Sequence, residues 1–206
     1  MTGWQQWRRR VWVMRVLSGA ARRWAWRRYV ESPGSRAARL EQASLGESGR
    51  LVFVCHGNIM RSAFATYVAR ERFPALSARI VGGGTHAKDG RKAQDVALAV
   101  AAQMDLPMEQ HSATPIEALA LTPRDVIVCM DAMNEANVLA VQPELAPRVF
   151  RVGDIVAGRE TALAAQALPD RELHDPYGKG ELVTRVAFDR LRALGVLWAE
   201  RVIAGK

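Results

Sequence analysis

Short apolar runs alternate with helical patterns along most of this chain. The first run, LVFVC at 51–55, predicts a buried strand, and 62–72 predicts a helix that ends before Pro74. Further strands are expected at 79–83, 125–130 and 148–152, and further helices at 92–104, 134–141 and 181–203. Strands that alternate with helices in this way predict βαβ units and a mostly parallel sheet.

Arginine and tryptophan are concentrated at the amino terminus. Residues 1–50 contain 11 arginines, no lysine and three acidic residues, which gives this segment a net charge of +8. The remaining 156 residues hold 18 basic and 18 acidic side chains, and five of the six tryptophans lie within the first 26 residues. A Gly/Ser-rich stretch at 44–49 predicts a linker. We therefore divide the chain into an N-terminal extension, 1–49, and a second domain, 50–206.

Apolar residues recur every three or four positions from 4 to 29, with one gap between Met14 and Ala21, which predicts a helix in the extension. Arginines interrupt it too often for a membrane-spanning segment or a signal peptide. Tryptophan and arginine together favour peripheral association of residues 1–30 with an anionic membrane surface, such as the inner membrane face. The alternatives are a solvated tail, a start at Met14, a transit peptide, and a segment that binds an acidic partner or nucleic acid; no specific nucleic acid is predicted.

Cysteine and histidine usage limits the chemistry that the chain can perform. The two cysteines, Cys55 and Cys129, allow no disulfide framework, and neither has a CxxC partner. We therefore expect a reduced, cytoplasmic protein. The four histidines show no spacing typical of metal ligands, so we expect neither a metal nor another cofactor.

The segment VCHGNIMRS, residues 54–62, joins the first expected strand to the first expected helix. Cys55 would lie at the carboxyl end of a strand, where parallel sheets bind ligands. A helix N-terminus offers free N–H groups and partial positive charge to an anion, and the same field stabilises a thiolate. Gly57 lets the backbone approach the ligand, and Arg61 offers a planar fork for two phosphate oxygens. The segment therefore predicts a phosphate ester bound beside a nucleophilic sulfur.

The same segment supplies the predicted phosphate-binding residues His56, Gly57, Asn58, Ile59, Met60, Arg61 and Ser62. Ser62 is expected to stabilise the sulfur, and Asn58 to fix the loop through side-chain hydrogen bonds. Cys-x5-Arg by itself arises easily by chance in an arginine-rich chain. A buried structural cysteine in a glycine-containing turn is the alternative interpretation.

The segment resembles the signature of the low-molecular-weight protein tyrosine phosphatases, V-C-x-G-N-x-C-R-S-P, which here reads VCHGNIMRSA. The resemblance extends from about residue 50 to residue 202. It includes GGGTHA at 82–87, CMDAMN at 129–134 and HDPYG at 174–178. The resemblance implies an α/β fold in which helices flank a four-stranded parallel sheet in a flavodoxin-like, three-layer arrangement. It also implies a cysteinyl-phosphate intermediate.

Roles for individual residues follow from the resemblance. Cys55, Arg61 and Asp175 are the expected catalytic residues, with Asp175 as general acid for a phenolate whose conjugate acid has a pKa of ~10. An ordinary Asp-Pro turn is the alternative interpretation of Asp175 and the proline after it. The expected substrate pocket consists of Ile59, His86, Lys88 and Tyr177. Asn58, Ser62 and His111 are expected to support the loop, and a surface position is the alternative for His111.

Three positions depart from the family pattern. Met60 replaces a second loop cysteine that in many members forms a protective disulfide with the nucleophile, so we expect peroxide to drive Cys55 toward irreversible oxidation. Ala63 replaces proline at the helix start. Gly82 replaces a serine that helps to hold the loop, so we expect some loss of loop rigidity.

The function predicted from these features is hydrolysis of phosphotyrosine monoesters. The resemblance implies a phosphotyrosine protein as substrate, with a bacterial tyrosine kinase as one candidate. A catalytically weak module that binds phosphotyrosine or another oxyanion is one alternative. Arsenate reduction is another, but only Cys129 remains as a relay thiol.

Overall fold

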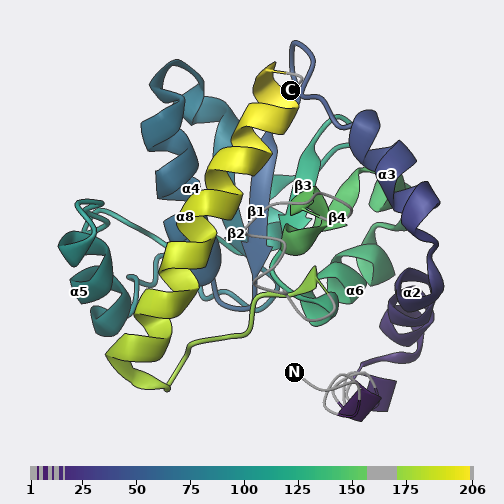
Figure 1. The fold of residues 1–206 in the computed structure, drawn as a ribbon, viewed down its shortest axis with the longest axis horizontal. Coiled ribbons are helices and arrows are strands. Elements are labelled where there is room, and N and C mark those ends of the chain that lie inside the picture. Colours follow the sequence, from purple (N-terminus) through teal and green to yellow (C-terminus); the bar gives the residue numbers. More distant parts are fainter. Residues whose placement is uncertain are drawn as a thin grey trace.

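A four-stranded, all-parallel sheet lies at the centre of the molecule, in the order β2-β1-β3-β4 (Figure 1). The computed structural model describes Trp4, Trp7, Arg8, Val11, Met14, Arg15, residues 17–156 and residues 171–204. The strands are β1 Leu51–Cys55, β2 Ile80–Gly84, β3 Val126–Cys129 and β4 Val149–Arg151. The four predicted strands are therefore confirmed, and their ends differ from the prediction by one residue at most.

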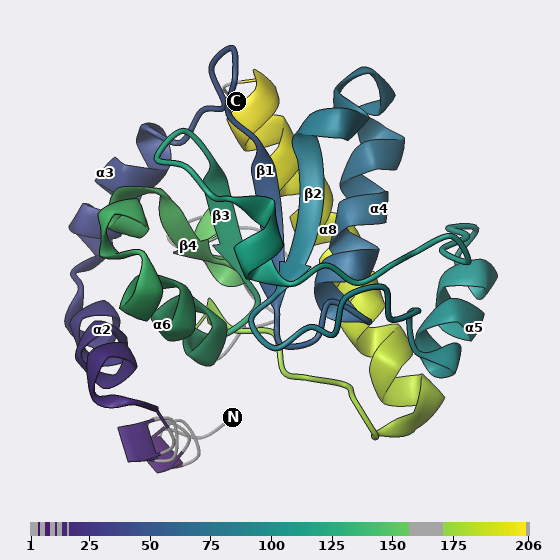
Figure 2. The ribbon, with the colours of Figure 1, turned by 180° about the vertical axis from the view of Figure 1, so that it is seen from behind.

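Helices cover both faces of the sheet and make three layers, which confirms the predicted α/β class (Figures 1 and 2). One face is covered by α4 (Arg61–Arg72) and α8 (Gly180–Ala204), with α5 (Asp95–Gln103) packed beside α8. The other face is covered by α6 (Ala132–Val141). Side chains alternate between the faces because a strand has a period of two residues. Leu51, Phe53 and Cys55 belong to the cluster under α4 and α8, whereas Val52 and Val54 belong to the cluster under α6.

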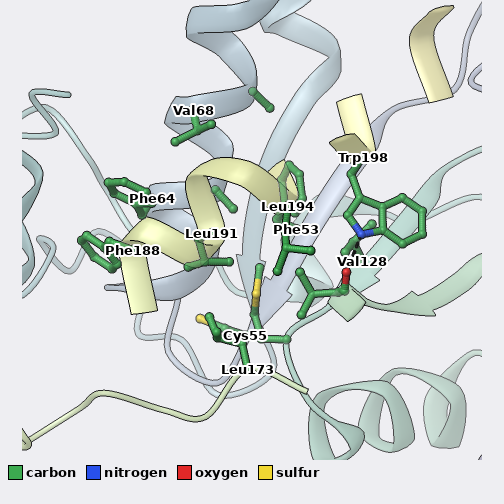
Figure 3. Packing of buried hydrophobic residues seen from close by; sticks show 14 of the residues in the cluster. Phe53, Cys55, Phe64, Val68, Val128, Leu173, Phe188, Leu191, Leu194 and Trp198 are labelled. Carbon is green, nitrogen blue, oxygen red and sulfur yellow. Dashed lines mark hydrogen bonds between the residues drawn. The ribbon is translucent and has the colours of Figure 1, made fainter. Parts of the chain in front are cut away.

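The larger hydrophobic core lies between the sheet and the pair α4 and α8 (Figure 3). Phe64 of α4 stacks on Phe188 of α8 with ring centroids 4.0 Å apart. Trp198 is completely buried, and its indole N–H donates to the carbonyl oxygen of Val152 at 2.8 Å. This hydrogen bond satisfies the one polar atom of the side chain, so the aromatic ring can fill the core without an unpaired donor.

Short 3₁₀ helices connect the main elements in the part of the chain that the structure describes. They are η1 Pro74–Arg79, η2 Ile116–Leu119, η3 Pro143–Arg148 and η4 Val152–Val156. Pro74 and Pro143 each stand just beyond the end of an α-helix, as expected for a residue that cannot donate to the preceding turn. No helix within the described residues is both long and apolar enough to span a bilayer.

The N-terminal extension contains a helix that packs on the rest of the molecule. Helix α2 (Gly19–Val30) lies against α6 through Ala21 and Ala25, whose small side chains let the two helices approach closely. Ser18 caps α2 by accepting a hydrogen bond from the Ala21 N–H. The continuous helix predicted from 4 to 29 is therefore wrong at Leu17 and Ser18, which are not helical; parts of its first half lie outside the described residues.

A second helix in the extension, α3 (Pro33–Glu41), was not predicted. Its start combines Ser32, whose hydroxyl accepts from the Ser35 N–H at 3.1 Å, with Pro33 in the first turn. Ser followed by Pro is a signal for a helix start that the apolar pattern alone does not reveal.

The stretch 44–49 is hydrogen-bonded to the second domain. The Leu45 N–H donates to the carbonyl oxygen of Val202 at 3.0 Å. The Arg79 guanidinium donates to the carbonyl oxygens of Gly46 and Gly49 at 2.7 and 2.6 Å. The extension is thus attached to the second domain through α2, through Arg39 of α3 and through the stretch 44–49, while the division at residue 49 stays a prediction.

Candidate active site

The loop formed by residues 55–62 follows β1 directly and enters α4. The Sγ atom of Cys55 lies 3.0 Å from the Ser62 hydroxyl and accepts a hydrogen bond from the backbone N–H of Asn58 at 3.2 Å. The N-terminal end of α4 adds partial positive charge at the same place. These groups favour negative charge on the Cys55 sulfur. The thiolate is the form in which a cysteine acts as a nucleophile.

Asn58 holds the loop in shape. Its φ of 50° lies in the left-handed region, which Asn tolerates better than most residues. The Asn58 amide donates to the Ser62 hydroxyl oxygen at 2.8 Å, and its Oδ1 accepts from the Thr114 N–H at 3.0 Å. His111 Nε2 lies 2.6 Å from the Asn58 carbonyl oxygen and must carry a proton to donate to it. Burial lowers the pKa of His111, so the ring is neutral at neutral pH.

Arg61 is the first residue of α4, and its side chain is almost completely buried. Nη1 donates to Asp131 Oδ2 at 2.8 Å and to the Leu173 carbonyl oxygen at 2.9 Å. Nη2 lies 2.9 Å from Asp175 Oδ2. Burial opposes the charge, but the surrounding negative groups, Asp131 foremost, raise the pKa of Arg61. Nε has no hydrogen-bond partner among the described residues, which leaves a donor for a ligand oxygen.

A cavity of about 370 Å³ adjoins the loop. It is lined by Cys55, His56, Gly57, Ile59, Met60, Arg61, His86, Lys88, Arg91, Asp175 and Tyr177. All of these except Arg91 are residues that the sequence analysis named for the site. The other three named residues, Asn58, Ser62 and His111, lie behind the loop and contact one another there.

Asp175 reaches the cavity from the turn that precedes α8. The Tyr177 N–H donates to Asp175 Oδ1 at 3.3 Å, so the Asp-Pro turn exists as the alternative interpretation supposed. The same turn directs the other carboxylate oxygen at Arg61. The Asp175 side chain is 44% exposed, which leaves it accessible to both substrate and water.

Two histidines form one side of the cavity. The rings of His56 and His86 stack with centroids 4.4 Å apart and an interplanar angle of 15°. Burial lowers the pKa of His56, and the neighbouring His86 lowers it further. The stacked rings offer a flat surface to an aromatic ring.

Two residues of the site were not recognised as such from the sequence. Arg91 lines the cavity, and only its place in the loop after β2 could have indicated this. Asp131 lies in the CMDAMN segment, which the sequence analysis used only for the family resemblance. Its carboxylate binds Arg61 directly and also caps α6 by accepting from the Asn134 N–H at 2.9 Å. No group of His, Cys, Asp or Glu suited to a metal ion occurs in the part of the chain that the structure describes, and the expectation of metal-free chemistry stays a prediction.

Comparison with known proteins agrees with this geometry. The sequence profile of the low molecular weight phosphotyrosine protein phosphatases matches residues 50–202. The chain belongs to this family. It is 28% identical over 152 residues to the low molecular weight protein-tyrosine-phosphatase Etp of Escherichia coli (strain K12). This match covers 74% of the chain and 93% of Etp. It is 26% identical over 155 residues to Wzb of Salmonella typhi, covering 75% of the chain and 95% of Wzb.

Solved structures show that the phosphatase shares its fold with enzymes of more than one specificity. The tyrosine phosphatase Wzb from Escherichia coli K30, in complex with sulphate, matches with a TM-score of 0.60 and 22% identity over 74% of this chain and 96% of that one. The YwlE arginine phosphatase from Geobacillus stearothermophilus matches with a TM-score of 0.60 and 23% identity over 74% and 92%. The fold alone therefore does not select the amino acid that carries the phosphate.

The second cysteine faces away from the site. Cys129 belongs to the hydrophobic cluster under α6, whereas Cys55 belongs to the cluster under α4 and α8. In the register of β1 and β3, Cys129 pairs with Val54, the residue before Cys55. Because side chains alternate along a strand, Cys129 shares the face of Val54, and the two cysteine side chains leave the sheet on opposite faces. Burial raises the pKa of the Cys129 thiol well above its ordinary value, and Glu135 and Asp131 raise it further.

We expect that mild peroxide oxidises Cys55 without forming a disulfide to Cys129, because a disulfide requires the two Cβ atoms to point toward each other. Mass spectrometry of peptides should show sulfinic or sulfonic acid at Cys55 and an unmodified Cys129. A Cys129→Ser variant should lose activity in peroxide at the same rate as the wild type. A Cys55–Cys129 disulfide in the wild type would contradict the placement of the two side chains.

Gly82 lies in β2 next to the groups that hold the loop. A Cβ atom at this position would lie 2.7 Å from Thr66 Oγ1 and 2.9 Å from Asn58 Nδ2. The Thr66 hydroxyl donates to the Ser62 carbonyl oxygen at 2.7 Å and occupies part of the space beside Gly82. The space beside Gly82 is thus taken up by side chains of α4 and of the loop.

We predict that Gly82→Ser lowers the free energy of unfolding by about 1–3 kcal/mol, because the added side chain must displace Thr66 or Asn58. It should also reduce the rate of phosphate ester hydrolysis. Thr66→Ala should have a small effect alone and should restore much of both losses when combined with Gly82→Ser. Urea unfolding and initial rates measure the two effects, and equal losses in the single and double variants would exclude the clash as their cause.

Proposed function

We propose that this family member hydrolyses phosphotyrosine through a cysteinyl-phosphate intermediate. The observation that carries the proposal is the meeting of three groups in one cavity: a sulfur that accepts hydrogen bonds, an arginine with a free buried donor, and an exposed carboxylate. They match the three requirements of the reaction, which are a nucleophile, an anion-binding group and a proton donor. The histidine pair His56 and His86 would receive the tyrosine ring.

In the first step the Cys55 thiolate attacks phosphorus while the bond from phosphorus to the phenolic oxygen breaks. The electron pair stays on the phenolic oxygen, and that oxygen takes the proton of Asp175. The phosphate oxygens accept hydrogen bonds from the Arg61 guanidinium and from the backbone N–H groups of the loop. Arg61 Nη2 pairs with Asp175 in the free enzyme, so the incoming phosphate would replace the carboxylate there and leave Asp175 facing the leaving group.

In the second step Asp175 takes a proton from water, and the resulting hydroxide attacks phosphorus. The bond between sulfur and phosphorus breaks, and its electron pair returns to Cys55 as a thiolate. The Ser62 hydroxyl, 3.0 Å from the sulfur, can donate a hydrogen bond to this leaving thiolate. Its oxygen already accepts from Asn58, which orients the hydroxyl. Ser62 would therefore stabilise the thiolate at both ends of the cycle.

The first test is hydrolysis of p-nitrophenyl phosphate and of phosphotyrosine by the wild type and two variants. Cys55→Ser should abolish turnover, and Asp175→Asn should reduce kcat/KM for phosphotyrosine by about 10²–10⁴-fold because general acid catalysis contributes that much. Phosphoarginine serves as the competing substrate. Preferred hydrolysis of phosphoarginine would overturn the tyrosine assignment. An inactive wild type that vanadate protects against heat would point instead to the oxyanion-binding module.

Arsenate reduction receives no support from the site. That chemistry needs further thiols to carry oxidation away from the nucleophile, and Cys129 lies on the opposite face of the sheet with a raised pKa. The phosphatase reaction returns Cys55 to its starting state without an external reductant. A phosphotyrosine protein is therefore the substrate class that we propose.

We further propose that residues 1–49 form an extension to a phosphatase domain, 50–206, and that this extension binds an anionic membrane surface. The outer face of α2 supports this, because Arg22, Arg23 and Arg27 are exposed there beside Trp26, which is 59% exposed. Among the described residues, none of these three arginines has a carboxylate partner. The exposed rings of Trp4 and Trp7 add apolar surface to the same segment. Arginine and tryptophan together suit the interface of an anionic bilayer.

We expect the full-length protein to co-sediment with vesicles that contain phosphatidylserine and not with vesicles of phosphatidylcholine alone. Arg23→Glu with Arg27→Glu should weaken this binding by at least about tenfold, since each basic residue near the surface contributes about 1 kcal/mol. The matched control, Lys92→Glu with Arg124→Glu, makes the same charge change on exposed positions of the other domain. Equal loss in both double variants would contradict a specific role for α2, and binding to RNA but not to vesicles would favour nucleic acid.

A further inference from the structure

Arg28 lies on the inner face of α2, outside the residues that match the phosphatase family. Its side chain is buried, and Nε lies 3.0 Å from Glu135 Oε1 in α6. Nη2 donates to the carbonyl oxygens of Ala146 and Val149, which lie just before and at the start of β4. A helix that only covers apolar surface does not require a buried charge, since removing a guanidinium from water is costly unless its partners are well placed.

The contacts of Arg28 continue toward the site through a buried ion-pair network. Glu135 Oε2 lies 2.7 Å from Nε of Arg151, the last residue of β4. Arg151 Nη1 lies 3.7 Å from Glu172 Oε1, which accepts a hydrogen bond from the Ala132 N–H at 3.2 Å. Among the described residues, the carboxylates Glu135 and Glu172 thus face the guanidinium groups of Arg28 and Arg151. One of the two positive charges comes from the extension.

A second contact joins α2 to Arg171, the residue before Glu172. Arg171 Nη2 donates to the backbone carbonyl oxygen of Arg28 at 3.3 Å, and Arg171 Nη1 donates to Asp154. Asp154 in turn accepts from the backbone N–H of Arg151 at 2.8 Å. Arg171 therefore binds the backbone of α2 directly, and Glu172 is linked to the Arg28 side chain through Arg151 and Glu135.

The segment held in this way leads directly to the general acid. Leu173 follows Glu172; its N–H donates to the Met130 carbonyl oxygen at 2.8 Å, and its carbonyl oxygen accepts from Arg61 at 2.9 Å. Asp175 lies two residues further on and pairs with Arg61. The path from α2 to the carboxylate of Asp175 therefore consists of contacts between buried charged groups and one short stretch of backbone.

We propose that Arg28 is a positioning residue for Asp175, so that the N-terminal extension takes part in aligning the general acid. This rests on the proposed function, in which Asp175 protonates the leaving oxygen. Without Arg28, Glu135 interacts with Arg151 alone, and the geometry in which Arg151 holds Glu172 is no longer enforced. The loop 171–175 then gains freedom, and Asp175 is aligned less often with the leaving oxygen. Small misplacements of a catalytic group have large effects on rate.

The test compares two substrates that depend differently on the general acid. Phenyl phosphate has a poor leaving group and needs the proton of Asp175, whereas p-nitrophenyl phosphate has a good one and needs it less. Arg28→Ala should lower kcat/KM for phenyl phosphate by about tenfold and for p-nitrophenyl phosphate by less than about threefold. In the Asp175→Ala background, Arg28→Ala should not change the ratio of the two rates further, because both substitutions act on the same step.

The matched control is Arg72→Ala, which also removes an arginine from an ion pair but on the surface of α4. The Arg72 side chain is 55% exposed, and its Nη2 lies 3.0 Å from Glu200 Oε1. It should leave both rates unchanged. If Arg28→Ala lowers both rates by the same factor, or changes neither, the positioning role is overturned. If the wild type hydrolyses neither ester, the proposed function fails instead, which is a distinguishable result.

Two further variants keep the test decisive if Arg28→Ala does not fold. Arg28→Lys retains the charge beside Glu135 but cannot reach both backbone carbonyl oxygens, so a partial shift of the same ratio is expected. Glu172→Gln removes the charge at the other end of the network and keeps an oxygen that can accept from the Ala132 N–H. It should produce the same selective loss on phenyl phosphate. An unchanged ratio in both folded variants would overturn the proposal.

Discussion

The buried guanidinium of Arg61 is the interaction on which the site depends. A charge in the interior needs well-placed polar and oppositely charged partners, and those of the two terminal nitrogens of Arg61 come from two distant parts of the chain. Asp131 follows β3, and Leu173 and Asp175 precede α8. Arg61 therefore joins the ends of separate elements around the carboxyl edge of the sheet, where the sulfur of Cys55 also lies. The same contacts that satisfy the charge assemble the groups required for phosphoryl transfer.

A second layer of buried charge connects this centre to the N-terminal extension. The composition of the first 50 residues suggests a solvent-exposed or membrane-facing segment, because its net charge is +8. In the folded chain the arginines divide into two groups. Arg28 and Arg39 turn inward and pair with Glu135 and Glu31, whereas others on α2 stay exposed. One helix can therefore serve two purposes, with an inner face that belongs to the phosphatase fold and an outer face that is free for a partner.

The strands and most helices of the second domain could be predicted because each has a strong local pattern. β1 is a continuous apolar run, and α4 begins where the loop supplies an arginine and a serine. The extension was harder, because α2 starts only after the Ser18 cap and α3 depends on a Ser-Pro start, and the apolar pattern marks neither start. Asp131 was not assigned to the site for a different reason. Its position at the start of α6 indicates a cap, and nothing local indicates that Arg61 lies within reach.

The sequence by itself determined the α/β class, the positions of the four strands along the chain, and the loop that brings a cysteine, an asparagine and an arginine to a helix start, because these depend on residues close together in the chain. The tertiary structure decided which distant residues meet. It placed Asp175 on Arg61, faced Cys129 away from Cys55, and buried Arg28 against Glu135. Such contacts depend on how elements pack, and the hydrophobic pattern of one element does not specify the partner of a polar side chain on another.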